Sequence, residues 1–353
     1  MIIAKRHREI ISGQRRGLRA ALWRAFLRSC EVPYAAAVRR RNRHFDQNKR
    51  HIHHVDIPVI CVGNITTGGT GKTPMVAWLA RWFRKRNVRV ALASRGYGTK
   101  HGSVNDEAME LQQLLPDVPH IQNPDRVAGA QAAIHQFDSQ LIILDDGFQH
   151  RRLHRDLDIV LVDALEPFGY GHLLPRGLLR ESLEGLGRAD VIALSRADLV
   201  TSDRRQQIQE EVHRFAPSAT WIELAHRPSC LMNSSGNEFP IDDFADRPVA
   251  AFCGIGNPEG FRQTLENCDL RVAQFREFPD HHAYSDEAIQ SLTDWATTNK
   301  PEALICTHKD LVKIALDQLG GVPLFALSIA IGFVNGRGPF EELLNTLAIR
   351  PVA

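Results

Sequence analysis

Residues 68–73 read Gly68-Gly69-Thr70-Gly71-Lys72-Thr73, and this motif largely determines the architecture of the chain. It follows an apolar run from Ile57 to Val62 and precedes a helical pattern from Met75 to Lys85. A strand, a glycine-rich loop and a helix in this order form a phosphate-binding P-loop, whose backbone N–H groups turn toward phosphate oxygens. The lysine can reach the β- and γ-phosphates, and the threonine can ligate Mg²⁺. The sequence therefore predicts a nucleotide-binding loop.

The loop departs from the strict G-x-x-x-x-G-K-[ST] pattern at its first position, where Thr66 replaces glycine. A glycine-rich turn that only packs a helix on a strand is the alternative. Such a turn does not require lysine and threonine at the start of the helix. We therefore expect the nucleotide to be bound by Thr66, Thr67, Gly68, Gly69, Thr70, Gly71, Lys72 and Thr73.

Beyond the loop, short apolar runs alternate with helical stretches. The runs are Ile57–Val62, Val88–Ala93, Leu141–Leu144, Ile159–Val162 and Val191–Leu194. This alternation is typical of a parallel sheet flanked by helices. We therefore predict an α/β fold of the P-loop NTPase type.

The carboxyl-terminal part predicts a second, smaller α/β domain. An irregular stretch over 221–240 contains the turn Asn233–Asn237 and is expected to form a hairpin-like connector. Three further strand-like runs follow it, Val249–Cys253, Ala303–Cys306 and Leu324–Ala326. The predicted organisation is an amphipathic N-terminal region over 1–54, a P-loop core over 55–220, the connector over 221–240 and the smaller domain over 241–353.

The amino-terminal region is strongly basic. The formal net charge of the chain is +2, but the first 50 residues hold 14 Lys/Arg and 3 Asp/Glu, which gives +11 there and −9 for the remainder. A basic arm on an acidic body indicates a polyanionic surface as partner. We expect a helix from Gln14 to Arg43, bent or divided at Pro33, because good helix formers dominate this stretch.

Two interpretations of this amphipathic helix stay open. Its apolar face holds Leu18, Leu22, Ala25 and Phe26, opposite Arg24 and Arg28, with Arg19 intruding on the apolar side. The helix could pack on its own domain, or Trp23 and Phe26 could enter the headgroup region of a membrane while arginines contact anionic phosphates. A nucleic-acid arm is disfavoured, because bulky aliphatic residues interrupt the basic ones.

Composition argues against several other classes. The sequence has no run of about 18 apolar residues and no signal-peptide pattern, so we expect neither a membrane span nor export. The six cysteines are scattered without a C-x-x-C pair. Neither a disulfide framework nor a zinc site is therefore expected, and a reducing cytosol is the default compartment.

Carboxylates follow two of the predicted strands. Asp145 and Asp146 end the run that begins at Leu141, where a Walker B acid would bind Mg²⁺, although helix capping by Asp146 is an alternative. Asp106 and Glu107 open an apparent helix, so a cap with a first-turn acid is the simpler explanation of this pair. A phosphoryl transferase nevertheless needs a carboxylate that deprotonates the acceptor hydroxyl.

Two adjacent histidines, His281 and His282, follow Asp280. Histidine beside an acid can support proton transfer, bind a metal or orient a carboxylate. A surface turn is the simpler account of these residues taken alone. No further Cys or His stands at metal-site spacing, which disfavours zinc.

Together, these motifs resemble the tetraacyldisaccharide 4'-kinases of lipid A synthesis. The resemblance covers about residues 10–330 and rests on six motifs in the order of that family. They are Val62-Gly63-Asn64 with the P-loop through Pro74, Ser94–Gly98, Asp106-Glu107, Asp145–His150, Leu174–Glu181 and Asp280–His282. The chain departs from the family pattern at Asn105 and Ala108, where Gly and Pro are expected, and at His308, where Glu is expected.

The resemblance implies transfer of the γ-phosphate of ATP, with Mg²⁺, to the 4'-hydroxyl of a tetraacyldisaccharide 1-phosphate. It implies a peripheral enzyme on the cytoplasmic face of the bacterial inner membrane, with no nucleic acid and no obligate protein partner. This favours the membrane interpretation of the N-terminal helix, since each acyl CH₂ taken out of the bilayer costs roughly 0.8 kcal/mol. The implied site residues are Asp106 as acceptor base, His281 or His282 as its orienting partner, Lys72 and Asp146 in catalysis, Thr73, Asp145, Asp146 and Glu107 at Mg²⁺, and Asn64, Arg95 and Arg180 in substrate contacts.

Two rival functions stay open. The stretch Ser195-Arg196-Ala197-Asp198 is similar to the guanine-reading N/T-K-x-D loop of GTPases and metal-delivery NTPases, although Arg196 stands where lysine is expected. A membrane-partitioning ATPase switch would also combine a P-loop with an amphipathic helix. The first rival predicts a preference for GTP, and the second predicts nucleotide-dependent dimerisation without a lipid acceptor.

Overall fold

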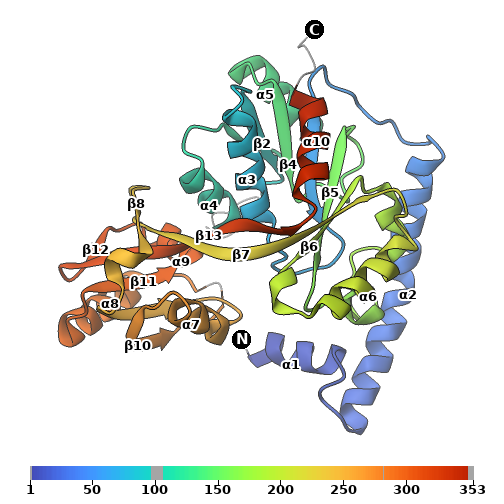
Figure 1. Ribbon diagram of the computed structural model, residues 1–353. Helices are drawn as coiled ribbons and strands as arrows, with labels where there is room; N and C mark the ends of the chain where they lie inside the picture. Colours follow the sequence, from blue (N-terminus) through green and yellow to red (C-terminus); the bar gives the residue numbers. More distant parts are fainter. Residues whose placement is uncertain (1, 97–105, 281, 349–353) are drawn as a thin grey trace. The chain divides into compact units, whose positions relative to one another are not determined.

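The computed structural model describes residues 2–96, 106–280 and 282–348. These residues form two compact units, shown in Figure 1. The P-loop unit comprises 2–96, 117–226 and 331–348, and the smaller unit comprises 106–116, 227–280 and 282–330. Strands β7 (Thr220–Met232) and β13 (Val322–Asn335) each begin in one unit and end in the other.

The P-loop unit is built on a parallel sheet. Its strands are β1 (Val59–Asn64), β2 (Val90–Ser94), β3 (His120–Gln122), β4 (Leu141–Asp145), β5 (Leu157–Asp163), β6 (Val191–Ser195) and the first part of β7. They lie in the order β7-β6-β5-β1-β4-β2-β3, and each neighbouring pair is parallel. Strands β1, β2, β4 and β6 are buried along their whole length, as expected when helices cover both faces of a parallel sheet. The predicted α/β fold of the P-loop type is confirmed.

In the part of the chain that the structure describes, two helices of the P-loop unit begin at a side-chain cap. The helices of this unit are α1 (Ile2–Ile11), α2 (Leu18–Asp46), α3 (Lys72–Arg84), α5 (Arg126–Phe137), α6 (Ser202–His213) and α10 (Arg337–Ala348), with 3₁₀ turns at Gly169–Gly171, Leu183–Arg188 and Ala197–Leu199. Asp125 caps α5 by accepting a hydrogen bond from the Val127 N–H group, and Thr201 caps α6 in the same way. Helix α3 buries Met75, Leu79 and Phe83 on one face and packs on β1, β2 and β4.

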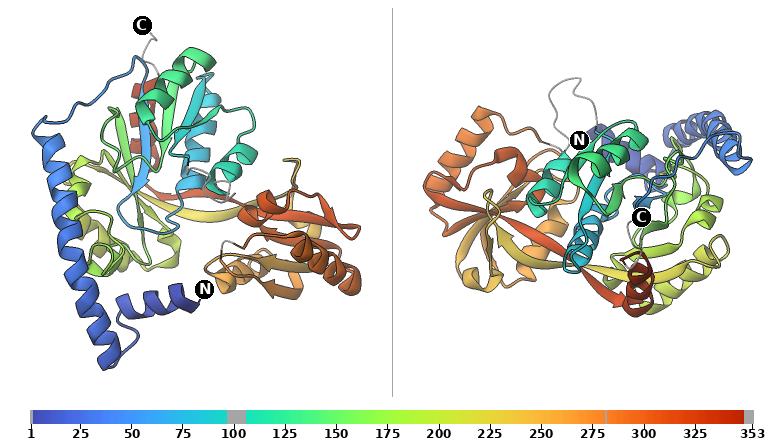
Figure 2. Two further views of the ribbon diagram at one scale, coloured as in Figure 1. Left: turned by 180° about the vertical axis from the view of Figure 1, so that it is seen from behind. Right: turned by 90° about the horizontal axis from the view of Figure 1, so that it is seen from above.

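The amino-terminal helix is shifted from its predicted bounds, because α2 begins at Leu18 and ends at Asp46, where Gln14 and Arg43 were expected. Helix α2 continues past Pro33 without a break, so the predicted division is wrong. Pro33 lies on the exposed side, where water can solvate the carbonyl group that loses its helical hydrogen bond. Helix α1 was not predicted, and it packs against α2 (Figure 2).

The smaller unit is a second α/β layer structure. Its elements are α4 (Asp106–Leu114), β8 (Glu238–Phe239), β9 (Pro248–Cys253), α7 (Pro258–Glu266), β10 (Arg271–Glu277), α8 (Asp286–Asn299), β11 (Ala303–Thr307), α9 (His308–Ile314) and β12 (Gln318–Leu319), with a 3₁₀ turn at Ile241–Phe244. Its strands lie in the order β10-β9-β11-β13. Along β9, Val249 and Ala251 join one hydrophobic cluster, and Ala250 and Phe252 join another. Both faces of this sheet therefore carry a core.

The unit boundaries differ from the predicted domain division. The segment 331–348 belongs to the P-loop unit, because Phe333 and Phe340 pack their rings against Trp78 on α3 at centroid distances of 5.1 and 5.8 Å. The stretch 106–116, predicted within the P-loop core, belongs to the smaller unit, where α4 packs on α9. The stretch predicted as an irregular connector is mostly the regular strand β7, and only its end forms a hairpin with β8.

Candidate active site

The P-loop follows β1 and is held in place by a distant segment of the same unit. The Thr67 N–H group donates to the carbonyl oxygen of Leu178 at 2.8 Å, and the Arg180 N–H group donates to the carbonyl oxygen of Ile65 at 2.8 Å. An isolated bridge joins Thr66 to Leu179. Residues of the predicted motif Leu174–Glu181 therefore pair with the P-loop through backbone hydrogen bonds, as a short strand would. Thr66, which stands where glycine is usual, takes part in this pairing through its backbone.

Gly71 meets both requirements that favour glycine at the end of the loop. Its φ of 87° is left-handed, and a Cβ atom there would lie 2.3 Å from Nε2 of His226. The same Nε2 lies 3.1 Å from Ser195 Oγ. Burial, together with the nearby Arg196, lowers the pKa of His226 to about 4, so this imidazole is neutral near pH 7. His226 therefore packs behind the P-loop as an uncharged ring.

Arg196 connects the P-loop to the neighbouring strands. Its guanidinium donates to the carbonyl oxygen of Gly69 at 2.7 Å and forms a short ion pair with Asp163 at the end of β5. These contacts give the Ser195–Asp198 motif a structural role in holding the loop. The arginine that departs from the guanine-reading pattern is thus engaged with protein groups, and the GTPase alternative is not favoured.

The structure brings together three side chains that the sequence analysis placed in the site. Lys72, at the first position of α3, is buried and its Nζ lies 3.7 Å from Asp146 Oδ1. Arg180 NH1 donates to both oxygens of Asp146 at 2.8 and 2.9 Å. Burial alone would raise the pKa of Asp146, but Lys72 and Arg180 outweigh it and hold this pKa below its ordinary value. Asp146 is therefore an ionised carboxylate beside the P-loop lysine.

Oxygen atoms suited to Mg²⁺ lie around this cluster. Asp145 is buried at the end of β4, and Thr73 is buried in the first turn of α3. The Asn64 side chain is fully buried, and its Nδ2 donates to Thr70 Oγ1 at 3.1 Å. Asn64 Oδ1 has no hydrogen-bond partner among the described residues. Carboxylate, hydroxyl and amide oxygens are the ligands that Mg²⁺ prefers, so this donor set fits the metal.

Arg126, at the start of α5, is a site residue that the sequence analysis missed. Its side chain is buried, and its NH1 donates to the carbonyl oxygen of Asn123 at 2.9 Å. Burial and the neighbouring Arg95 lower its pKa, while Asp146 and Asp145 act in the opposite direction. Arg95 itself is exposed directly after β2. A sequence signal for Arg126 would have been its position just after Asp125, the cap of a helix that follows a strand of this sheet.

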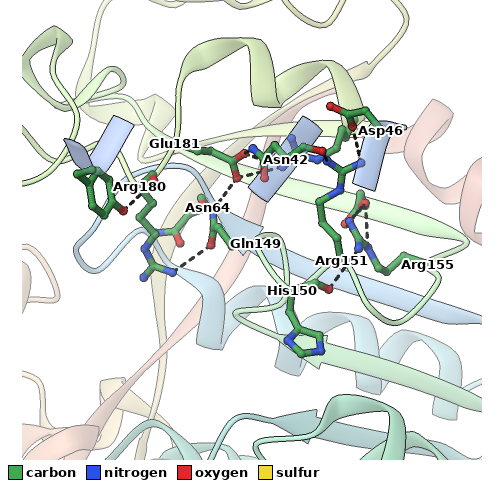
Figure 3. A network of polar contacts seen from close by, with 12 residues as sticks. Asn42, Asp46, Asn64, Gln149, His150, Arg151, Arg155, Arg180 and Glu181 are labelled. Carbon is green, nitrogen blue, oxygen red and sulfur yellow. Dashed lines mark hydrogen bonds and ion pairs between the residues drawn. The ribbon is translucent and has the colours of Figure 1, made fainter. Parts of the chain in front are cut away.

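A polar network extends from Arg180 toward the amino-terminal helix (Figure 3). Gln149 Nε2 donates to the carbonyl oxygen of Asn64 at 2.9 Å and to Glu181 Oε1 at 3.1 Å. Arg188 pairs with both oxygens of Glu181 at 2.9 and 3.0 Å. Gln149 and Glu181 stand inside motifs that the sequence analysis quoted, but no role was assigned to either.

The remaining predicted residues belong to the smaller unit. Asp106 is the first residue of α4, but its side chain and all of His281 lie outside the described residues. Glu107 is half-buried in the first turn of α4. His282 stacks on Phe278 with ring centroids 4.8 Å apart and meets Tyr284 edge-on at 4.9 Å. Of the two histidines, His282 is thus part of an aromatic cluster.

The buried carboxylate of Asp310 joins several segments of the smaller unit. Asp310, fully buried, accepts hydrogen bonds from the Gly254 N–H group, from Tyr284 Oη at 2.9 Å and from Thr307 Oγ1 at 2.6 Å. His308, which replaces the expected Glu, lies 2.8 Å from Gln113 Oε1 on α4. The departure from the family pattern therefore still connects α9 to the helix that begins at Asp106.

Comparisons with known proteins agree with this geometry. The family model described as tetraacyldisaccharide-1-P 4'-kinase matches residues 23–348. The chain is 35% identical to the tetraacyldisaccharide 4'-kinase of Halothermothrix orenii over 82% of this chain and 84% of the relative, and 35% identical to that of Desulfatibacillum aliphaticivorans over 91% and 92%. The crystal structure of LpxK from Aquifex aeolicus in complex with ATP covers 92% of this chain and 99% of its own, with a TM-score of 0.75 and 32% identity. The chain belongs to the tetraacyldisaccharide 4'-kinase family.

Proposed function

We propose that this chain is an ATP-dependent kinase that phosphorylates the 4'-hydroxyl of a tetraacyldisaccharide 1-phosphate. The observation that carries the proposal is the cluster of Lys72, Asp146 and Arg180 beside a P-loop at the carboxyl end of a parallel sheet. Ligands of open α/β sheets bind at this edge. The membership of the chain in the kinase family supports the identity of the nucleotide and of the acceptor.

The P-loop unit would bind ATP through charge and through backbone N–H groups. The amino terminus of α3 favours phosphate, and Lys72 is placed to stabilise the negative charge that develops on the transferred phosphoryl group. Thr73, Asp145 and Asp146 would hold Mg²⁺, which neutralises charge on the β- and γ-phosphates. Because Lys72 and Arg180 keep Asp146 ionised, its carboxylate is in the form that binds a cation.

The acceptor hydroxyl must lose a proton during the reaction. We assign this step to Asp106, with His281 as its orienting partner, because His282 is already engaged in an aromatic cluster. Arg126 lies near Asp145 and Asp146, and Arg95 lies near Arg126, so both arginines add positive charge for anionic groups of the substrates.

The direct test is incubation with ATP, Mg²⁺ and a disaccharide 1-phosphate lipid acceptor, followed by mass analysis. One added phosphate on the lipid, lost in a folded Lys72→Ala protein, is the expected result. Competition between ATP and GTP belongs in the same experiment. Consumption of nucleotide without phosphorylated lipid, or a clear preference for GTP, would refute the proposal.

Helix α2 supplies the contact with a membrane in this proposal. One face packs on the P-loop unit through Ala20, Leu27, Ala35, Val38 and Phe45. The opposite face presents an apolar stripe, which consists of Leu18, Leu22, Trp23, Phe26 and Val32, with exposed fractions from 46 to 77%. Arg39, Arg40 and Arg43 follow on the same helix. Exposed apolar residues beside basic ones are typical of a helix that lies in the interface of an anionic membrane.

This arrangement supports peripheral binding at the cytoplasmic face of the inner membrane, with anionic lipid as the surface. Among the described residues, the structure contains no helix that is both long and apolar enough to span a bilayer. We expect Trp23→Ser together with Phe26→Ser to weaken association with vesicles that contain anionic lipid, and we expect added salt to weaken it further. A matched double change at the exposed residues Phe137 and Leu316, which lie outside the stripe, should leave association unchanged. Equal vesicle binding by all three proteins would contradict the membrane role of the stripe.

A further inference from the structure

The amino-terminal helix contacts the segment that carries Arg180. Tyr34 Oη on α2 donates a hydrogen bond to the carbonyl oxygen of Arg180 at 2.9 Å. Two turns further along α2, Asn42 Nδ2 donates to Glu181 Oε2 at 2.8 Å. Two consecutive residues of the segment are therefore fixed by two side chains of one helix, as Figure 3 shows for Asn42 and Glu181.

Glu181 connects α2 to the other residues of the polar network. Its side chain is fully buried and receives hydrogen bonds from Asn42, Gln149 and Arg188. A buried carboxylate is stable only when its oxygens are paired, so the positions of these donors and of Glu181 depend on one another. Gln149 also donates to the carbonyl oxygen of Asn64, which ends β1. The network thus ties α2 to the strand that leads into the P-loop.

Arg180 connects α2 to Asp146. Its N–H group donates to the carbonyl oxygen of Ile65 in the P-loop, its carbonyl oxygen accepts from Tyr34, and its guanidinium holds both oxygens of Asp146. One nitrogen, NH1, makes both hydrogen bonds to Asp146, so the pair depends on where the arginine backbone places that single nitrogen. A small displacement of the segment would therefore disturb the pair.

We propose that Tyr34 and Asn42 are positioning residues for phosphoryl transfer, through which α2 sets the placement of Arg180 beside Asp146. The inference rests on the proposed function, which assigns Lys72, Asp146 and Arg180 to the reaction. In this inference α2 has a second role, because the helix that carries the apolar stripe also fixes a segment of the active site. The membrane contact and the catalytic centre then share one rigid element.

The test compares Tyr34→Phe and Asn42→Ala with a control on the same helix. Each change removes one hydrogen bond to the segment, so kcat should fall roughly two- to tenfold, while KM for ATP stays within about twofold. Asn42→Asp, which places a second carboxylate against Glu181, should lower kcat further. Asp46→Asn removes the 2.7 Å ion pair of α2 with Arg151 but does not touch the segment, so its kcat should equal that of the wild type.

A second readout does not depend on turnover. Hydrogen exchange of the Arg180 amide should be faster in Tyr34→Phe and Asn42→Ala than in the wild type, and unchanged in Asp46→Asn. Vesicle association should be the same in all four proteins, because the apolar stripe is intact. Wild-type kcat and wild-type exchange in both variants, or equal losses in Asp46→Asn, would overturn the inference. A wild-type protein that phosphorylates no lipid would refute the proposed function, while the exchange rates would still decide whether α2 positions Arg180.

Discussion

Lys72 is buried beside Asp146, and its replacement separates a catalytic role from a structural one. Lys72→Ala should lower kcat by about 10²- to 10³-fold or more, because the charge on the transferred phosphoryl group loses its principal protein cation. The fold should persist, since Arg180 still pairs with Asp146. Measured kcat and circular dichroism check both expectations. Lys85→Ala, at the exposed end of α3, is the matched control and should behave as the wild type. Near-normal turnover in folded Lys72→Ala protein would exclude the assignment of Lys72.

His226 predicts a pH dependence of stability. In the folded protein its pKa is about 4, whereas an unfolded chain takes up this proton near the ordinary value of about 6.5. Between these values the unfolded state binds more protons, so the free energy of unfolding falls as the pH drops from about 6.5 toward 4, by up to about 3 kcal/mol. His226→Gln, which keeps a polar group near Ser195 but does not titrate, should lose less stability over this range. Thermal unfolding at several pH values measures the difference.

The control for this prediction is His213→Gln, because His213 is exposed at the end of α6. His150 has a similar depressed pKa of about 4, caused by burial and by Arg126, so some acid sensitivity should remain in His226→Gln. If His226→Gln and the wild type lose stability in parallel from pH 6.5 to pH 4, the buried, neutral state of His226 is contradicted.

At the scale of elements, the position of the P-loop depends on its tether to β5 and β6. Arg196→Ala removes the hydrogen bond to the Gly69 carbonyl oxygen and the ion pair with Asp163. The loop should then be less well ordered for phosphate binding, so KM for ATP should rise roughly three- to tenfold, as expected for the loss of one charge-assisted hydrogen bond. Arg262→Ala, which breaks an exposed ion pair with Glu266 within α7 of the smaller unit, serves as control. An unchanged KM in Arg196→Ala would mean that the loop holds its conformation without this contact.

The elements that the sequence predicted correctly share a local signal. Strands β1, β2, β4, β5 and β6 are fully or almost fully buried, so each appears as an uninterrupted apolar run. Strand β7 does not, because exposed polar residues such as Arg227 and Ser229 alternate with half-buried residues in its second half. The packing of α10 on Trp78 could not be predicted from local pattern, since the two lie more than 250 residues apart and only the folded chain brings them together.

In the candidate site of the whole molecule, residues within local sequence motifs were likewise predicted, whereas residues that matter through burial were not. Lys72, Asp145 and Asp146 were placed in the site because each ends, follows or opens an element of the P-loop sheet within a recognisable motif, whereas Arg180 was assigned through the family resemblance. Arg126 and His226 were missed, because their importance comes from burial beside the site and no local pattern marks it.

If Asp106 is the acceptor base, turnover depends on a residue of the smaller unit. Asp106 begins α4, which the Gln113–His308 contact fixes to α9 within the smaller unit. Positioned bases contribute typically 10²- to 10⁴-fold, so Asp106→Ala should lower kcat by about this factor with little change in ATP affinity. His281→Ala should also lower kcat, whereas His282→Ala should chiefly lower the melting temperature, because it removes a ring from the cluster with Phe278 and Tyr284.

A purely structural acid at the start of α4 would give a different result. Loss of a helix cap costs roughly 0.5 to 2 kcal/mol of stability but leaves kcat nearly normal in the molecules that stay folded. Asp286→Ala removes an acid from the first turn of α8 in the same unit and calibrates this structural effect. Measurement of kcat, ATP affinity and melting temperature on one preparation of each variant separates the two cases. A lowered melting temperature with normal kcat in Asp106→Ala, matching Asp286→Ala, would show that Asp106 caps a helix and that another group accepts the hydroxyl proton.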